Sequence, residues 1–311
     1  MNRGREPIRD SSCLIYQAKP NKLGNYFRGY PMEIRITTLS ENTANYGYLA
    51  EWGLSILVEV DGLRILMDTG LSFSAVHNAQ LMGIDLTTID RIVLSHGHAD
   101  HTGGLREVLR RRGEVEVIAH PDIWAPKYVR RDGETEEQYI GIPFSREELE
   151  SLGAHFNPEL NSGEPVRITD RILTTGEIPM LSGYEEIENN LFVKEAGVLQ
   201  PDRLADDLAL VIDTDFGLIV ILGCAHRGII NTLRHAQRLT GKELVYAVIG
   251  GTHLLRASDE HIEQTIADLK EMGIQRLGVS HCTGFHASAR LAQEFEGIFF
   301  LNNAGTRLTL P

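Results

Sequence analysis

The sequence has few cysteines, no long apolar run and a deficit of basic residues. Its three cysteines, Cys13, Cys224 and Cys282, leave one unpaired and are too few for a disulfide framework, so we expect a reducing compartment. No apolar run approaches the roughly 18 residues of a membrane span. The first residues, Met1 to Pro7, lack the apolar segment of a secretion signal. We therefore expect a cytoplasmic protein with no membrane partner.

The charge balance is acidic, since 43 acidic residues oppose 30 basic ones and give a formal net charge of −13. Contacts from lysine and arginine to phosphate supply most of the nonspecific affinity of proteins for nucleic acid. The short basic runs at 110–112 and 130–131 are expected on solvated helix faces. We therefore expect no nucleic-acid partner. A homo-oligomer is compatible with this composition.

The 311 residues include 42% hydrophobic residues, which is enough for a large core. Residues 1–31 are polar and irregular and are expected to form an N-terminal extension. Residues 32–311 are expected to form a single domain. Within it, the segment from about 120 to 165 is charged, aromatic and rich in proline. It is predicted to be an inserted cap over the functional site, with a simple surface excursion as the alternative.

Apolar periodicity predicts the order of the elements. A strand is expected at 32–37, and strands at 54–60 and 63–67 are expected to form a hairpin around Asp61–Gly62. Helices are expected at 72–83, 103–112, 227–240, 258–272 and 286–295, and further strands at 89–95, 115–119, 166–174, 207–213, 217–222, 244–249, 276–280 and 298–300. Hairpins lead each half and strand–helix alternation follows. This pattern predicts an α/β fold, an αββα sandwich of two mixed sheets with helices on the outer faces.

Four candidate metal ligands lie within six residues of the sequence Ser95-His-Gly-His-Ala-Asp-His-Thr-Gly-Gly104: His96, His98, Asp100 and His101. The apolar run before them and the glycines after them indicate a strand-to-helix turn, where Gly97 lets the backbone fold tightly. Histidine and aspartate are rarely fully buried without partners. Imidazole and carboxylate groups suit zinc, with iron or manganese as alternatives. We therefore predict a metal site, and the spacing can serve two ions.

The pattern His-x-His-x-Asp-His resembles the metallo-β-lactamase superfamily, which implies the αββα fold and a metal site. Further motifs resemble one branch of that superfamily, which includes dihydropterin-ribofuranosylaminobenzene phosphate synthase of methanopterin biosynthesis. These motifs are Thr175–Pro179, Asp206–Leu210, Gly223–His226, Gly250–His253 and Ser280–Gly284. The resemblance covers roughly residues 33–310. It implies fold and metal chemistry more strongly than substrate, because one fold hosts many chemistries.

The second half of the superfamily's fold contributes a histidine, a bridging aspartate or cysteine, and a final histidine. The resemblance places Cys224 at the bridging position and His281 at the final one. For Cys224, a buried small hydrophobe is the alternative. The other histidine position departs from the family pattern, because Thr174–Pro179 contains Glu177 and no histidine. Either His226 fills that position or Glu177 acts as an oxygen ligand.

Three further residues are expected to support the site. Asp68 matches an early aspartate of the family, which implies a partner that orients ligand histidines. His253 follows a predicted strand and is expected to contact substrate or to support a ligand. Thr283 lies in one of several glycine-containing turns at helix starts, where backbone amides could meet an anion. Tight turns are the alternative for these glycines. A phosphorylated small molecule would suit an anion site.

A pair of metal ions lowers the pKa of bound water and gives hydroxide at neutral pH. The sequence therefore predicts a metal-dependent hydrolase-type enzyme with two divalent ions, for which zinc is favoured. Asp100 is expected to bind one ion and to orient the hydroxide. The expected substrate is small and phosphorylated or pterin-like, and the synthase activity of the resembled branch is compatible. The alternatives are a metal-dependent nuclease, diiron redox chemistry and a non-catalytic, metal-dependent ligand sensor.

Overall fold

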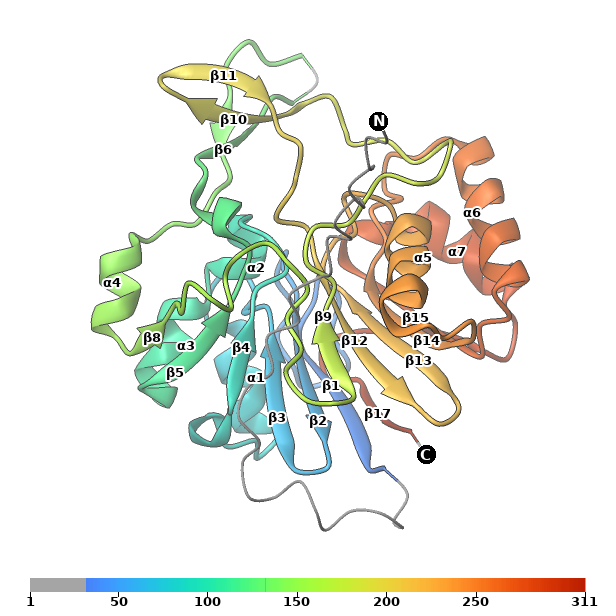
Figure 1. Cartoon of the computed structure of the whole chain (residues 1–311), viewed down its shortest axis with the longest axis horizontal. Coiled ribbons are helices and arrows are strands. Elements are labelled where there is room, and N and C mark those ends of the chain that lie inside the picture. Colours follow the sequence, from blue (N-terminus) through green and yellow to red (C-terminus); the bar gives the residue numbers. More distant parts are fainter. Residues whose placement is uncertain (1–31, 132, 311) are drawn as a thin grey trace, which may run out of the picture.

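The structure is a computed structural model that describes residues 32–131 and 133–310. Two large sheets face each other in the centre, and helices cover their outer faces (Figure 1). This is the predicted αββα sandwich. The expected N-terminal extension, residues 1–31, and Cys13 within it lie outside the described residues.

The first sheet has seven strands, and its order brings the C-terminal strand next to the first one. The order is β17 (Arg307–Leu310), β1 (Ile34–Ser40), β2 (Ser55–Val60), β3 (Leu63–Met67), β4 (Arg91–Val93), β5 (Val115–Ile118) and β8 (Ala154–His155). Strands β17 to β3 are antiparallel, whereas β3, β4, β5 and β8 run parallel. Asp61 and Gly62 have φ of 50° and 86°, the positive values that a tight hairpin turn requires. The predicted hairpin is confirmed.

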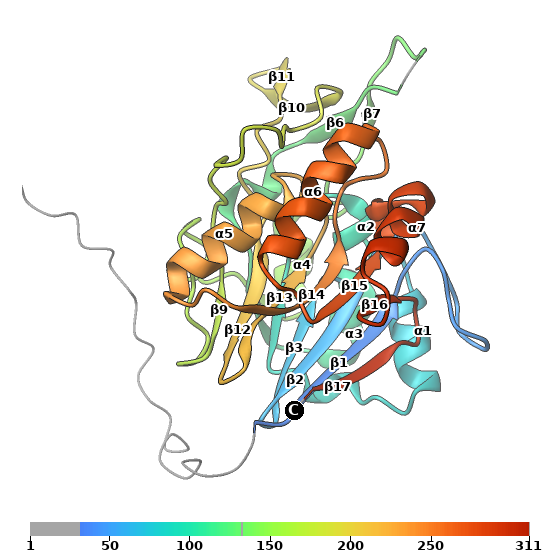
Figure 2. The ribbon, with the colours of Figure 1, turned by 90° about the vertical axis from the view of Figure 1, so that its right-hand side faces the viewer.

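The second sheet has six strands and contains the later strand–helix alternation. Its order is β16 (Phe299–Leu301), β15 (Arg276–Ser280), β14 (Val245–Gly251), β13 (Gly217–Leu222), β12 (Ala209–Thr214) and β9 (Ile172–Thr174). Strands β13 to β16 are parallel. Its outer face is covered by α5 (Ile229–Thr240), α6 (Asp259–Glu271) and α7 (Phe285–Glu294) (Figure 2).

Alternation along the strands builds three apolar layers. In β2, Ile56 and Val58 point into the core between the sheets, whereas Leu57 packs toward α1 (Ser74–Leu81) and α3 (Leu105–Arg112). Ile219 and Ile221 of β13 enter the same central core from the second sheet. Side chains of a strand alternate between faces. Both faces of each sheet are therefore buried, and the strand ends are fixed rigidly.

A separate four-stranded sheet rises above the sandwich (Figure 1). Its order is β11 (Val198–Pro201), β10 (Leu191–Glu195), β6 (Lys127–Val129) and β7 (Gln138–Tyr139). The segment from about 120 to 165 therefore does not form one unit. Strands β6 and β7 belong to the projecting sheet, whereas α4 (Arg146–Ser151) packs on the outer core of the first sheet and β8 joins that sheet. The projecting sheet combines part of the expected cap with residues 191–201, where no strand was predicted. Its role as a cap stays a prediction.

Among the described residues, no helix is long and apolar enough to span a bilayer.

Candidate metal centre

The first metal motif lies directly after β4, where the chain turns into the short helix α2 (Ala99–Thr102). Gly97 permits this turn, because a Cβ there would lie 2.5 Å from the Ile123 carbonyl oxygen. A Cβ on Gly104 would lie 2.0 Å from the Thr69 carbonyl oxygen, and its amide donates to the Gly70 carbonyl at 3.0 Å. Close packing therefore explains why residue 104 is a glycine. Because its amide already donates a hydrogen bond, it is not available to an anion.

Three histidines converge in a first group of candidate ligands. His96 Nε2 lies 3.1 Å from His98 Nδ1 and 3.2 Å from His226 Nε2. His96 and His98 come from the loop after β4, and His226 comes from the loop after β13. All three side chains are buried. The sequence left open whether His226 or Glu177 fills the remaining histidine position. In the structure, His226 lies next to His96.

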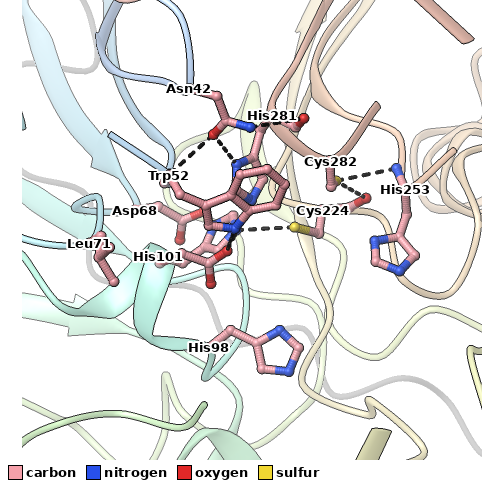
Figure 3. A network of polar contacts seen from close by, with 12 residues as sticks. Asn42, Trp52, Asp68, Leu71, His98, His101, Cys224, His253, His281 and Cys282 are labelled. Atoms are coloured by element: carbon pink, nitrogen blue, oxygen red, sulfur yellow. Dashed lines mark hydrogen bonds and ion pairs between the residues drawn. The ribbon is translucent and has the colours of Figure 1, made fainter. Parts of the chain in front are cut away.

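A second group contains Asp100, His101 and His281. His281 Nε2 lies 3.2 Å from His101 Nε2 and 3.2 Å from Asp100 Oδ2. His281 opens η3 (His281–Thr283) at the end of β15. The Cys224 sulfur lies 3.1 Å from His101 Nε2 (Figure 3). It forms a potential ligand set with His96 and His101. Cys224 therefore lies between the two groups. Its role as a bridging ligand stays a prediction.

The spacing of the donor atoms in the first group fits a divalent ion. Tetrahedral zinc with Zn–N bonds near 2.0–2.1 Å holds its nitrogen ligands about 3.3 Å apart, close to the 3.1 and 3.2 Å found in the first group. Burial lowers the pKa of His98 to about 3, so this imidazole is neutral, as a ligand must be. Burial alone would raise the pKa of Asp100, but His101 and His281 outweigh it and keep the carboxyl ionised. Although burial lowers the pKa of His101, Asp68 and Asp100 raise it to about 9, so this imidazole would have to release a proton on binding a metal ion.

Asp68 contacts the back of His101. Its Oδ2 lies 2.6 Å from His101 Nδ1, and its two oxygens accept hydrogen bonds from the Ser95 amide and hydroxyl, each at 2.7 Å. The Asp68 side chain is fully buried. A carboxylate in this position fixes the tautomer and ring orientation of a ligand histidine. Asp68 therefore makes the contacts that are needed to orient the His101 ring.

The loop between β1 and β2 carries contacts that sequence analysis missed. Asn42 Oδ1 lies 2.9 Å from His281 Nδ1, and Glu41 accepts a hydrogen bond from the His281 amide at 2.6 Å. Trp52 donates its indole N–H to Asp100 Oδ2 at 2.9 Å. Asn42 and His281 are 239 residues apart in the sequence. No local motif marks such a contact, so only the fold reveals it.

Glu177 is not part of either group. Its carboxylate is 53% exposed and accepts a hydrogen bond from Arg227 Nη1 at 2.9 Å. Within the part of the chain that the structure describes, the candidate ligand sets do not include Glu177. The alternative in which Glu177 supplies an oxygen ligand therefore has no support from the geometry.

His253 and Thr283 have different surroundings. The His253 ring lies 4.0 Å from the His226 ring, measured between centroids, and its Nε2 lies 3.6 Å from Glu188 Oε1. His253 is thus close enough to contact a ligand of the first group. Thr283 is fully buried, and its hydroxyl donates to the Ser280 carbonyl at 2.7 Å. It supports the turn after β15.

A buried ion-pair network ties the projecting sheet to the metal motif. Lys127 of β6, whose side chain is 1% exposed, lies 2.9 Å from both Asp202 and Asp206. The other oxygen of Asp206 accepts the Gly97 amide at 2.8 Å. Its neighbour Asp207 accepts the Arg227 amide at 2.9 Å. Asp206 and Asp207 therefore hold the two loops that carry His98 and His226.

The fold and the converging side chains define a class, that of αββα proteins with a metal centre at the ends of their strands. Residues 53–190 match the family model described as metallo-beta-lactamase superfamily. The 7,8-dihydropterin-6-methyl-4-(beta-D-ribofuranosyl)-aminobenzene-5'-phosphate synthase of Methanocaldococcus jannaschii is 35% identical over 285 residues, which are 88% of this chain and 95% of the relative. The chain belongs to the metallo-β-lactamase superfamily.

Two further relatives are informative. The crystal structure of Tm1679, described as a metal-dependent hydrolase of the beta-lactamase superfamily, superimposes with a TM-score of 0.76 at 30% identity. The match covers 89% of this chain and 99% of that one. A probable RNase of Methanocaldococcus jannaschii is 24% identical over 226 residues, 67% of this chain and 51% of the relative. Proteins similar to this chain thus carry the names of a synthase, a hydrolase and a nuclease.

Proposed function

We propose that this chain is a metal-dependent enzyme with two divalent ions, for which zinc is favoured, and that it acts on a small phosphorylated or pterin-like molecule. The observation that carries the proposal is the convergence of seven of the nine side chains that could hold a metal ion among the described residues, from both halves of the chain, shown in part in Figure 3. They are His96, His98, His226, Asp100, His101, His281 and Cys224. Packing alone does not account for this set, because buried imidazoles need partners.

The protein side chains have distinct tasks in this proposal. His96, His98 and His226 would hold one ion, Asp100, His101 and His281 the other, and Cys224 would contact both. When bound, such ions supply Lewis acidity and a water of lowered pKa. The ionised Asp100 carboxylate would accept a hydrogen bond from the attacking group and so orient it. Asp68 keeps His101 in the ligand tautomer through the contact at 2.6 Å.

The proposed substrate class is supported by the relative that is 35% identical over 88% of this chain. That protein's name describes a product with a pterin, an aminobenzene and a 5'-phosphate. Tm1679 carries the name of a hydrolase. A centre of two metals can activate a nucleophile for hydrolysis or stabilise charge during bond formation. Hydrolysis and synthase chemistry therefore both belong to the proposal.

The proposal is tested by purifying the protein without added metal, measuring its metal content, and assaying it with phosphoesters, lactones, β-lactams, pterin precursors and RNA. We expect about two ions per chain and turnover of a small phosphorylated or pterin-like compound. Turnover should be lost in His98→Ala and retained in Glu177→Gln, whose target lies outside the ligand groups. A protein that binds no divalent ion would overturn the proposal. Turnover of RNA alone would favour the nuclease.

A further inference from the structure

We propose that Trp52 has two roles at the metal centre. Its indole N–H positions the Asp100 carboxylate, and its exposed ring face stacks on a planar heteroaromatic ring of the substrate. The inference rests on the proposed function, because it requires a metal ion at Asp100. It adds a positioning residue for one ligand and a chemical class for the part of the substrate that lies next to the second group.

The polar edge of Trp52 is committed to the ligand. Its Nε1 lies 2.9 Å from Asp100 Oδ2, the same oxygen that lies 3.2 Å from His281 Nε2. The indole and imidazole rings of Trp52 and His281 are 5.2 Å apart between centroids. An indole nitrogen can only donate. This contact therefore fixes the direction of an acceptor carboxylate, and Figure 3 shows the indole beside His101 and His281.

The backbone on both sides of Trp52 is held in place. Before it, the Glu51 carboxylate accepts hydrogen bonds from the amides of Leu71 and Ser72, each at 3.1 Å. After it, Gly53 packs so closely that a Cβ there would lie 2.6 Å from the Asp100 carbonyl oxygen. That carbonyl also accepts the Leu54 amide at 3.1 Å. The loop is thus fastened to the metal motif, and the indole is preorganised for a ligand.

Part of Trp52 remains open to a ligand. The residue is 50% exposed, although its N–H partner Asp100 and its ring neighbour His281 belong to a largely buried group. A rigid, exposed aromatic ring beside a metal centre offers a stacking surface. Planar heterocycles gain most from such a surface, whereas a phosphate or a sugar gains little. The geometry therefore favours a pterin-like or arylamine ring over a purely aliphatic substrate.

Two substitutions separate the roles. Trp52→Phe keeps an aromatic ring and loses the N–H, whereas Trp52→Leu loses both. Trp124→Phe is the matched control, because Trp124 packs on Phe156 at 5.1 Å between centroids and belongs to neither ligand group. Zinc affinity is measured by competition with a chromophoric chelator. Binding of pterin, with ribose 5-phosphate as the ring-free comparison, is measured by calorimetry on the zinc-loaded proteins. Thermal unfolding confirms that each variant folds.

We expect both Trp52 variants to bind one of the two zinc ions about tenfold more weakly. We expect Trp52→Leu to bind pterin at least about tenfold more weakly, and Trp52→Phe to stay within about threefold of the wild type. Affinity for ribose 5-phosphate should not change. Equal pterin binding by the wild type and Trp52→Leu, or a wild-type zinc protein that does not bind pterin, would overturn the inference and leave the metal centre intact. A wild-type protein without zinc would instead overturn the proposed function.

Discussion

The ammonium group of Lys127 lies 2.9 Å from the Asp206 carboxylate, and both side chains are almost completely buried. Asp202 lies 2.9 Å from the same ammonium. One cation is thus shared by two carboxylates beneath the metal motif. Burial lowers the pKa of a lone lysine, but the two carboxylates outweigh burial and raise the pKa of Lys127. The network therefore holds Lys127 in its charged form.

Replacing Lys127 with methionine should destabilise the protein strongly. The substitution leaves two buried carboxylates without their cation, and breaking a buried pair in this way costs about 3–5 kcal/mol. The free energy of unfolding from urea titration measures the loss. Lys194→Met, at an exposed position of β10, is the control and should change stability by less than about 0.5 kcal/mol. Equal stability of the two variants would contradict the structural role of the network.

The Asp68→Asn variant should bind one ion more weakly. Asparagine retains the shape, but it cannot supply the carboxylate that holds His101 Nδ1 at 2.6 Å. Loss of such a partner weakens metal affinity by roughly 10- to 100-fold. Competition with a chromophoric zinc chelator measures the change. The Asp122→Asn variant, at an exposed position, is the control and should bind zinc like the wild type. Equal zinc affinities of the two variants would show that Asp68 does not support metal binding.

The pair His226→Ala and Glu177→Gln tests which residue completes the first group. His226 Nε2 lies 3.2 Å from His96 Nε2, whereas Glu177 faces Arg227. We expect His226→Ala to retain about one ion per chain and Glu177→Gln to retain two. Elemental analysis after gel filtration measures both. The reverse result would assign the ligand position to Glu177.

Gly97→Ala should disturb the metal motif. Its new Cβ would lie 2.5 Å from the Ile123 carbonyl oxygen, so the backbone must shift. Overpacking of this kind costs typically about 1–3 kcal/mol. It should also displace His96 and His98 and weaken metal binding. Gly183→Ala, where no atom lies within 4 Å of the added Cβ, is the matched control. Unchanged urea stability and zinc affinity of Gly97→Ala would contradict the close packing at this turn.

Most of the sandwich could be predicted from sequence because its longer strands and its helices show a period. The hairpin around Asp61–Gly62 has a favoured turn, and the strand–helix pairs have clear apolar faces. The hairpin of β10 and β11 turns at Ala196 and Gly197, with φ of 48° and 85°. Alanine rarely adopts such a φ, so this turn gave no sequence indication. Strand β17 was not predicted either, because it is only four residues long and pairs with β1 at the other end of the chain.

The candidate site likewise contains residues that the sequence predicts and residues that only the structure reveals. The motif from His96 to His101 is local, so its ligand chemistry is visible in the sequence. The choice between His226 and Glu177 depends on how two sheets pack, and only the structure brings His226 to His96. Trp52 and Asn42 lie in a loop without a metal-binding pattern. Their contacts with Asp100 and His281 arise from the close approach of chain segments distant in sequence.

The central feature of the proposed metal centre is a pair of cations bound between both halves of the chain, with Cys224 between them. Anomalous X-ray diffraction from crystals of the zinc-loaded protein, collected on both sides of the zinc absorption edge, tests this directly. We predict two peaks, one among His96, His98 and His226 and the other among Asp100, His101 and His281. The absence of a peak at these residues, or zinc bound only elsewhere on the chain, would contradict the proposed metal centre.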